Sequence, residues 1–320
     1  MENIYREIGK ELEQRDNFLI CSHFSPDGDN IGSSLAIHRF LKSIGKRSII
    51  SNQDPFPEKF KFLLKDDIYV KGKDLNEKFD NIIVLDIGSY NRLGDVRDSI
   101  NRESFIINID HHISNNSFGD LNLIKPKKAA TAQMVYDLLV NNKFTINSSI
   151  AEPLYVGLLT DTGGFRYQST DSEVLKVASD LSSYDIDPSD LIENAIYKNS
   201  AEDLKAISTL LSNFEVNKKL KLLTLFHDNT ILKVDDNDMV LSMLNSVSNI
   251  DVVLYVRKIS EGLVKGSFRS KKFDVSKFAL KHGGGGHKNA SGLRFNGTID
   301  EFKKNILEDL IKDIEAYEDL

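Results

Sequence analysis

Four apolar segments of this sequence are each followed by histidine or aspartate, the side chains that most often bind metal ions or move protons. The segments are 18–21, 82–85, 105–109 and 154–159, and the residues after them are His23, Asp27, Asp29, Asp86, Asp110, His111, His112 and Asp161. An open α/β sheet holds its ligands beyond the carboxyl ends of its strands, so these side chains are expected at one rim. Five carboxylates and three imidazoles at one rim predict a metal site, and their number indicates two ions.

Each of these segments alone has an ordinary explanation. Asp-His-His after a strand can simply begin a loop, and Asp27 and Asp29, with Pro26 and Gly28 beside them, can be plain turn chemistry. Asp86 alone would serve as a cap for the residues that follow it. The combination favours a metal site, because all four apolar segments end in the same way.

The elements that must position these residues follow from the hydropathy pattern. Strands are expected at 17–21, 47–51, 82–86 and 105–109, and helices at 31–44, 131–142, 148–159 and 172–184. This alternation predicts an α/β fold whose N-terminal part is a doubly wound, mostly parallel sheet with helices on both faces. From residue 220 the pattern changes to short strands at 220–226, 251–258 and 262–269, with helices near 237–246 and 299–317. We therefore expect a catalytic domain at 1–188, a helical linker at 189–216 and a smaller α/β domain at 217–320.

Composition points to a globular protein of the cytoplasm. Hydrophobic residues make up 40% and charged residues 28%, and no apolar stretch reaches the roughly 18 residues that a membrane span needs. The N-terminal segment is amphipathic and lacks the apolar centre of a signal peptide. The single cysteine, Cys21, lies inside an apolar strand and suits a reducing compartment as a core residue.

Charge is unevenly distributed along the chain. The whole chain carries −7, whereas segment 251–290 contains nine Lys/Arg against three acidic residues, a net +6. A basic segment in an acidic protein indicates a phosphate-bearing ligand, although a charge run alone is more often a solvated surface. Four consecutive glycines, 283–286, can bring backbone N–H groups against an anion or can form an ordinary flexible loop.

Taken together, these motifs resemble the DHH phosphoesterase superfamily. The matching residues are His23-x-x-x-Asp27-x-Asp29, Asp86, Asp110-His111-His112 and Asp161-Thr162-Gly163-Gly164, in the family's order. Segments 266–270 and 283–292 resemble the DHHA1 domain that accompanies this catalytic domain in one branch. The size and layout are similar to the nanoRNase/pAp-phosphatase group, that is, the bifunctional oligoribonucleases. Gln133 departs from the pattern, since relatives often carry glutamate there.

The resemblance implies a role for each residue of the predicted metal site. His23, Asp27 and Asp86 would hold one divalent cation, and Asp29, Asp86, His111 and Asp161 would hold the second, with Asp86 bridging the two. His112 would contact the phosphoryl oxygen or protonate the leaving group, and Asp110 would support the neighbouring histidines. Mixed His and Asp ligands suit Mn²⁺ better than Mg²⁺, with zinc and iron as further candidates.

The resemblance also implies a site for the substrate, in the cleft between the two domains. The residues expected to contact it are Arg92, Arg166, Arg257, Arg269, Ser270, Gly284, Gly285, Gly286 and His287. An enclosed cleft of this kind would admit only a few nucleotides.

The expected function is therefore hydrolysis of very short oligoribonucleotides, including pApA, to mononucleotides, with 3′-phosphatase action on pAp. Partners would be short RNA or (cyclic) dinucleotides and no membrane, and a homodimer is a further expectation from the family. The main alternative is a cyclic di-AMP phosphodiesterase. An inorganic pyrophosphatase or a catalytically dead nucleotide-binding protein fits less well, because the ligand set is complete and the second domain is rich in glycine.

Overall fold

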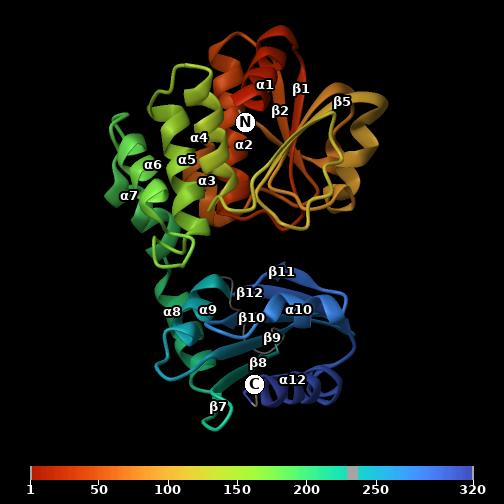
Figure 1. Ribbon diagram of the computed structural model, residues 1–320, viewed down its shortest axis with the longest axis vertical. Coiled ribbons are helices and arrows are strands. Elements are labelled where there is room, and N and C mark those ends of the chain that lie inside the picture. The colour runs from red at the N-terminus through yellow and green to blue at the C-terminus, as the bar shows by residue number, and fades with distance from the viewer. Residues whose placement is uncertain (1, 229–236, 319–320) are drawn as a thin grey trace. The chain divides into compact units, whose positions relative to one another are not determined.

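The computed structural model describes residues 2–228 and 237–318, which fold as two compact units (Figure 1). The first unit is Met1–Lys198 and the second is Asn199–Leu320. The division between them falls inside segment 189–216, for which the sequence predicts a helical linker. Within the described residues, every helix is too short or too polar to cross a membrane.

The first unit is built on a six-stranded sheet in which every pairing is parallel. The strands stand in the order β3–β2–β1–β4–β5–β6. Their bounds are β1 (Phe18–Cys21), β2 (Ser48–Asn52), β3 (Tyr69–Lys71), β4 (Phe79–Leu85), β5 (Ile100–Asp110) and β6 (Leu121–Ile124). The chain runs outward from β1 to β3 and then starts again at β4 on the other side. The strand order therefore reverses between β1 and β4, where open α/β sheets bind their ligands.

Helices cover one face of this sheet, as Figure 1 shows for α2, α4 and α5. They are α1 (Glu2–Gln14), α2 (Gly28–Ser43), α4 (Thr131–Asn141), α5 (Ser148–Asp161), α6 (Ser172–Ser182) and α7 (Pro188–Ile192), with the short α3 (Lys61–Leu64). Alternate strand residues such as Ile20, Ile83 and Ile109 point into this core. The opposite residues, such as Leu19 and Val84, pack under the 3₁₀ segment Tyr90–Ser99. We expected helices on both faces, and this short segment takes their place because it alone connects β4 to β5.

The second unit holds a mixed six-stranded sheet in the order β11–β12–β10–β9–β8–β7. The strands are β7 (Glu215–Asn217), β8 (Leu222–His227), β9 (Val252–Ser260), β10 (Leu263–Ser270), β11 (Gly285–His287) and β12 (Ala290–Asn296). Among the strands formed by the described residues of this unit, only β8 and β9 pair in parallel. The helices are α8 (Ala201–Leu211), α9 (Asn237–Asn245), α10 (Val275–Lys281), α11 (Ile299–Phe302) and α12 (Glu308–Glu318).

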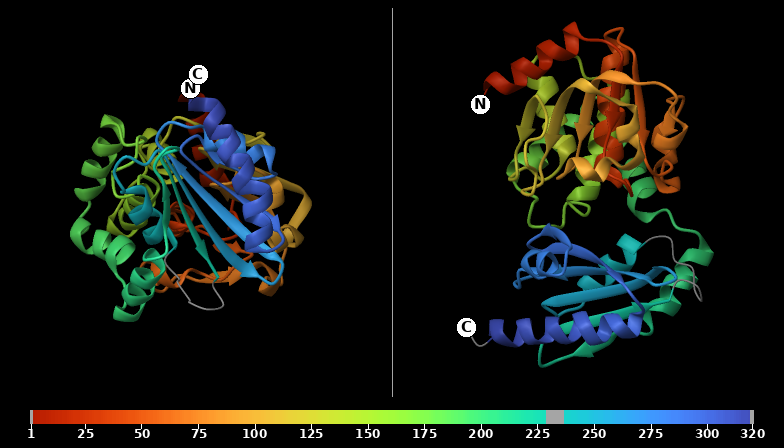
Figure 2. Two further views of the ribbon diagram at one scale, coloured as in Figure 1. Left: turned by 90° about the horizontal axis from the view of Figure 1, so that it is seen from below. Right: turned by 90° about the vertical axis from the view of Figure 1, so that its right-hand side faces the viewer.

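The helices of the second unit divide between the two faces of its sheet. Helices α8 and α9 pack against β8 and β9 on one face, around Leu223, Leu225 and Val253. Helices α10, α11 and α12 pack on the other face, around Leu254 and Phe268. Figure 2 shows α12 running along this second face of the sheet.

The predicted fold class, a parallel α/β sheet followed by a smaller sheet domain, is confirmed. The pattern analysis missed β3, β6, β7, β11 and β12, each of which lies at or next to a sheet edge and has only three to seven residues. It also missed α10. Such short segments lack a hydrophobic period long enough to separate a strand or helix from a loop.

Candidate metal centre

His23 follows β1 and turns one edge of its ring toward two carboxylates. Its Nδ1 lies 2.8 Å from the carbonyl oxygen of Phe24. Because a carbonyl only accepts, Nδ1 carries the proton, and Nε2 presents its lone pair in the neutral ring. That Nε2 lies 3.3 Å from Asp86 Oδ2 and 3.7 Å from Asp27 Oδ2. Because this lone pair and the two carboxylates face one another, a cation between them could bind all three groups.

His111 repeats this arrangement at the end of β5. Its Nδ1 lies 3.1 Å from the carbonyl oxygen of Lys128, so the ring donates there and presents Nε2 to the centre. Nε2 lies 3.4 Å from Asp161 Oδ2, 3.5 Å from Asp86 Oδ1 and 3.9 Å from Asp29 Oδ2. Both histidines are about 5% exposed, and a backbone carbonyl sets the tautomer of each ring.

Asp86 lies between the two histidines. It follows β4 and has a φ of +56°, a left-handed conformation that aspartate tolerates better than most residues. One carboxylate oxygen faces His23 and the other faces His111, and the residue is 2% exposed. Strained backbone of this kind persists where the surrounding structure determines it, and it gathers at functional sites.

Asp29 is held at the start of α4. Its Oδ2 accepts from the N–H of Thr131 at 2.6 Å, and its Oδ1 accepts from the N–H of Ala132 at 2.8 Å. These are N–H groups that a helix leaves without an internal partner, and the positive end of the helix favours the carboxylate. The Thr131 hydroxyl also donates to Asp86 Oδ1 at 3.1 Å. Thr131 therefore orients two predicted ligands at once.

His112 and Asp110 form a separate pair beside the centre. His112 Nδ1 lies 2.7 Å from Asp110 Oδ1, and the His112 backbone N–H donates to the same oxygen at 3.1 Å. The other Asp110 oxygen accepts from Asn115 Nδ2 at 2.7 Å. Asp110 is fully buried, and both of its oxygens accept hydrogen bonds, which hold His112 and the loop after β5 in place.

Mutual interactions shift the pKa values of these groups. Burial opposes the charge of Asp86, but the rings of His111 and His23 outweigh it and hold the pKa of Asp86 well below its usual value. Burial lowers the pKa of His111, but the carboxylates of Asp86, Asp161 and Asp29 together raise it well above the ordinary value. Burial raises the pKa of Asp161 to about 7, and the nearby Asp27 and Asp86 add to that effect.

Two groups of predicted ligands have ligand atoms that lie within 4.8 Å of one another, and Asp86 also forms such a group with Asp110 and His112. One group is His23, Asp27 and Asp86, and the other is Asp29, His111 and Asp161. These are the two sets that the family resemblance implies, with Asp86 Oδ1 also 3.5 Å from His111 Nε2. Mixed imidazole and carboxylate donors fit a divalent transition metal. Two such cations would offset the clustered negative charge, so the residues present fit a two-metal centre.

Three contributors to this centre escaped the pattern analysis. Thr131 and Ala132 act partly through backbone N–H groups, which leave no mark in the sequence except the start of a helix. Asn115 looks like a turn residue, because Asn116 and Ser117 follow it.

Gln133, the departure from the family pattern, accepts from the Ala129 N–H through Oε1 at 3.0 Å. A glutamate could accept that bond equally well, so the amide keeps the contact without adding a buried charge.

The predicted arginines of the first unit differ in their surroundings. Arg92 is half-buried, with its guanidinium carbon 5.4 Å from the centre of the Phe24 ring, next to His23. Its charge opposes the protonation of His23, which places it within electrostatic reach of that ring. Arg166 is exposed and its Nε donates to the carbonyl oxygen of Gly163 at 2.7 Å.

The predicted substrate residues of the second unit lie on adjacent strands. Arg257 is on β9, and Arg269 and Ser270 end β10. Gly285, Gly286 and His287 form the edge strand β11, paired with β12, where a loop was one of the readings. The Gly284 N–H donates to the carbonyl oxygen of Ala279 at 2.7 Å and so ends α10. Arg269 and His287 each pair with Ala290 across β12, so one small residue separates them on the same face.

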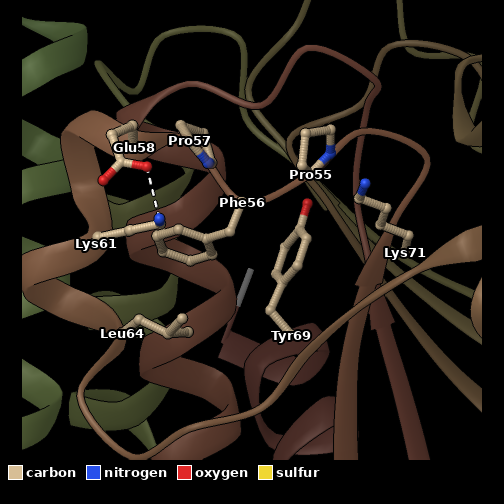
Figure 3. Close-up of a pocket in the computed structure, with 8 residues that line it drawn as sticks. All are labelled: Pro55, Phe56, Pro57, Glu58, Lys61, Leu64, Tyr69 and Lys71. Atoms are coloured by element: carbon tan, nitrogen blue, oxygen red, sulfur yellow. Dashed lines mark ion pairs between the residues drawn. The ribbon is translucent and has the colours of Figure 1, made fainter.

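A pocket of about 520 Å³ lies elsewhere in the first unit (Figure 3). It is lined by Pro55, Phe56, Pro57, Glu58, Lys61, Leu64, Tyr69 and Lys71. None of the predicted site residues lines it. The carboxylate–histidine cluster is therefore distinct from this cavity.

Comparison with known proteins identifies the family. Residues 17–158 match the domain described as "DHH family, N-terminal domain", and residues 220–317 match the DHHA1 domain. A Thermus thermophilus protein described as "Bifunctional oligoribonuclease and PAP phosphatase NrnA" is 35% identical over 291 residues, covering 90% of this chain and 87% of that protein. The chain belongs to the DHH family. The predicted family and the prediction of a hydrolytic enzyme are confirmed.

Other relatives of this DHH protein extend over nearly its whole length. A Streptococcus mutans protein described as a "Probable bifunctional oligoribonuclease and PAP phosphatase NrnA" is 27% identical, covering 95% of this chain and 99% of that protein. A crystal structure of an exopolyphosphatase-related protein from Bacteroides fragilis is 28% identical with a TM-score of 0.88, covering 99% of this chain and 97% of that chain. Both units of the fold are therefore shared with these proteins.

Proposed function

We propose that this protein hydrolyses very short oligoribonucleotides, including pApA, to mononucleotides, and removes the 3′-phosphate of pAp. The observation that carries the proposal is the position of Asp86, with one oxygen 3.3 Å from His23 Nε2 and the other 3.5 Å from His111 Nε2. A carboxylate between two such groups is suited to bridge a pair of cations. Two metals about 3.5–4 Å apart are a common device for attack on phosphate esters.

The residues of the centre form two sets of metal ligands. His23, Asp27 and Asp86 would hold one divalent cation, and Asp29, Asp86, His111 and Asp161 the other, with Mn²⁺ the expected ion. When bound, the two cations act as Lewis acids and make water an effective nucleophile near neutral pH. Asp29 and Asp86 are fixed in orientation by Thr131 and the start of α4.

His112 is the proposed proton donor to the leaving oxygen. Its Nδ1 forms a hydrogen bond with Asp110 Oδ1 at 2.7 Å. This bond fixes the orientation of the ring and leaves Nε2 as the nitrogen that can give a proton to the substrate. Burial lowers the pKa of His112, but Asp110 and Asp86 raise it overall, so the ring keeps its proton to higher pH. A general acid must hold its proton at the working pH, and the raised pKa of His112 favours the protonated ring.

The choice of substrate is supported by the relatives and by charge. The Thermus and Streptococcus relatives are both described as oligoribonuclease and PAP phosphatase, over most of this chain. Arg257, Arg269 and His287 of the second unit provide donors for the phosphates and bases of such a substrate. The buried Cys21 fits action in a reducing cytoplasm.

Turnover of a panel of substrates tests the proposal. The panel is pApA, a five-nucleotide RNA, pAp, cyclic di-AMP and pyrophosphate, each with Mn²⁺, with a chelator and with Asp86→Asn as a control for contaminating nucleases. We expect pApA and the short RNA to be cleaved fastest and chelation to abolish turnover. Faster cleavage of cyclic di-AMP would make the protein a cyclic dinucleotide phosphodiesterase instead. Undiminished activity in chelator would refute the two-metal assignment.

A further inference from the structure

The segment that joins β6 to α4 orients three of the predicted metal ligands. The carbonyl oxygen of Lys128 lies 3.1 Å from His111 Nδ1. The first two residues of α4 donate their backbone N–H groups to Asp29, and the hydroxyl of the first also donates to Asp86. Residues 128–132 therefore set the directions of an imidazole and two carboxylates that come from other parts of the chain.

The contact with His111 is made by the peptide group that joins Lys128 to Ala129. Its carbonyl oxygen accepts from the His111 ring, and its N–H, which belongs to Ala129, donates to Gln133 Oε1 at 3.0 Å. Because a peptide group is planar, the bond at its N–H also fixes the direction in which its C=O points. Gln133 is 1% exposed. The acceptor that sets the His111 tautomer therefore depends on a buried glutamine.

The side chain of Lys128 ties the same residue to two helices. Its Nζ lies 2.7 Å from Asp137 Oδ2 on α4, and it also pairs with Glu173 on α6. Burial lowers the pKa of Lys128, but the two carboxylates outweigh it and raise that pKa above its ordinary value. The side chains of Lys128 and Asp137 are 16% and 17% exposed, whereas that of Glu173 is 56% exposed. Because exposed ion pairs contribute little, Asp137 is the main partner of the ammonium group.

Other contacts hold α4 and α6 together without Lys128. The Tyr136 hydroxyl of α4 donates to a carboxylate oxygen of Asp180 on α6. Val135 of α4 and Val177 of α6 are buried in the same hydrophobic core. Loss of the ammonium group should therefore leave the packing of the two helices in place and loosen the segment that precedes α4.

We propose that Lys128 and Gln133 are positioning residues for the metal centre, which together hold the peptide group between residues 128 and 129 in the orientation that His111 requires. This inference rests on the proposed function and extends it to residues behind the ligands. Histidines that bind metals are oriented by the group that accepts from their other ring nitrogen. Here that group is a backbone carbonyl, so the side chains that fix the peptide control the ligand.

The effect should fall on one of the two cations. His111 belongs to one set of predicted ligands and His23 to the other. The His23 ring is oriented by the carbonyl oxygen of Phe24, which lies in a different part of the chain. Loss of a group that orients a metal ligand lowers metal affinity about 10–100-fold. Lys128 and Gln133 act through the backbone, so we expect the lower end of that range.

Binding of Mn²⁺ to the full chain, measured by calorimetry without substrate, tests both residues. Lys128→Met removes the charge and keeps most of the side chain, and Gln133→Leu removes the acceptor of the Ala129 N–H. In each variant we expect one of the two Mn²⁺ binding steps to weaken about tenfold and the other to change less than twofold. In chelator, hydrogen exchange of the backbone N–H groups of residues 128–132 should become several-fold faster, because the segment opens more often.

Lys127→Met is the matched control, because Lys127 is exposed and the change removes the same charge from the same segment. It should leave both Mn²⁺ affinities and the hydrogen exchange unchanged. Lys128→Arg keeps the ion pair and Gln133→Glu keeps the acceptor, so each should hold both affinities within about threefold of the unaltered chain.

Unchanged Mn²⁺ binding in Lys128→Met or in Gln133→Leu would overturn the role given to that residue. An equal loss in Lys127→Met would reduce the effect to net charge, and an equal loss of both binding steps would indicate general damage to the fold; either result would overturn the proposal. Turnover of pApA by the unaltered chain is measured separately. Its absence would refute the proposed function, while the Mn²⁺ comparison would still decide the role of Lys128 and Gln133.

Discussion

Thr131→Val isolates one hydrogen bond at the centre of the proposed site. The Thr131 hydroxyl donates to Asp86 Oδ1 at 3.1 Å, while its backbone N–H donates to Asp29 Oδ2. Valine keeps the shape and the backbone bond and removes only the hydroxyl. Asp86 then loses the donor that fixes the oxygen facing His111.

The magnitude follows from the charge and the length of this bond. A hydrogen bond to a charged group contributes about 1.5–3 kcal/mol, which corresponds to roughly 10–100-fold in an equilibrium constant. Groups that orient metal ligands have effects of about the same size, 10–100-fold in metal affinity or activity. Strong O–H···O⁻ bonds measure about 2.5–2.7 Å, so a bond of 3.1 Å belongs at the lower end. We therefore expect Mn²⁺ affinity to fall about tenfold.

The assay is pApA turnover as a function of free Mn²⁺, with direct Mn²⁺ binding by calorimetry beside it. Thr131→Ser keeps the hydroxyl and should restore the affinity to within about twofold. Thr160→Val is the matched control, because that hydroxyl precedes Asp161 but donates to the helix carbonyls of Val156 and Gly157. Unaltered Mn²⁺ dependence in Thr131→Val, or failure of the serine to restore it, would refute the role given to this bond.

Three further changes probe the same centre. Asp86→Asn should lower pApA turnover at least about 100-fold at a temperature where the variant is folded, while its melting temperature in chelator falls, because His111 and His23 stabilise the Asp86 charge in the folded state; a loss of activity explained by unfolding would count against this reasoning. Asp110→Asn should lower the pKa of His112 and move the alkaline limb of the kcat profile to lower pH; an unmoved limb would exclude His112 as the acid. In chelator the melting temperature should fall as pH rises from about 5 to 8, because raised pKa values at His111 and Asp161 mean that the folded state binds more protons. Mn²⁺ should reverse the sign of that pH dependence, because the residues that bind it must be deprotonated. If Mn²⁺ left the pH dependence of the melting temperature unchanged, His111 and Asp161 would not be ligands of the cation.

The strand-end residues could be predicted because their signal is local. His23, Asp86 and His111 each follow a short apolar run, and parallel strands bring their carboxyl ends to one edge. Asp161 required a different argument, since it ends the helix α5 rather than a strand. Its sequence context, Thr160 to Gly164, marked it through small residues and the family motif.

The supporting contacts could not be predicted, for a physical reason. Asp29 bonds to the backbone of Thr131 and Ala132, about a hundred residues away, and backbone donors are the same for every residue type except proline. The bond between His111 and the Lys128 carbonyl likewise depends on a backbone oxygen, and β6, which leads into that segment, was itself missed.

The metal centre is also part of the folding of the first unit. Asp29 caps α4 with both oxygens, Asp86 is held by two histidines and Thr131, and Asp110 is held by His112 and Asn115. These buried carboxylates therefore have protein donors of their own, which explains how an acidic cluster can fold before any cation arrives. Burial and nearby carboxylates nevertheless raise the pKa of Asp29 well above its usual value and the pKa of Asp161 to about 7. A cation beside His111 would therefore displace protons from Asp29 and Asp161, so cation binding should be coupled to pH at these two carboxylates.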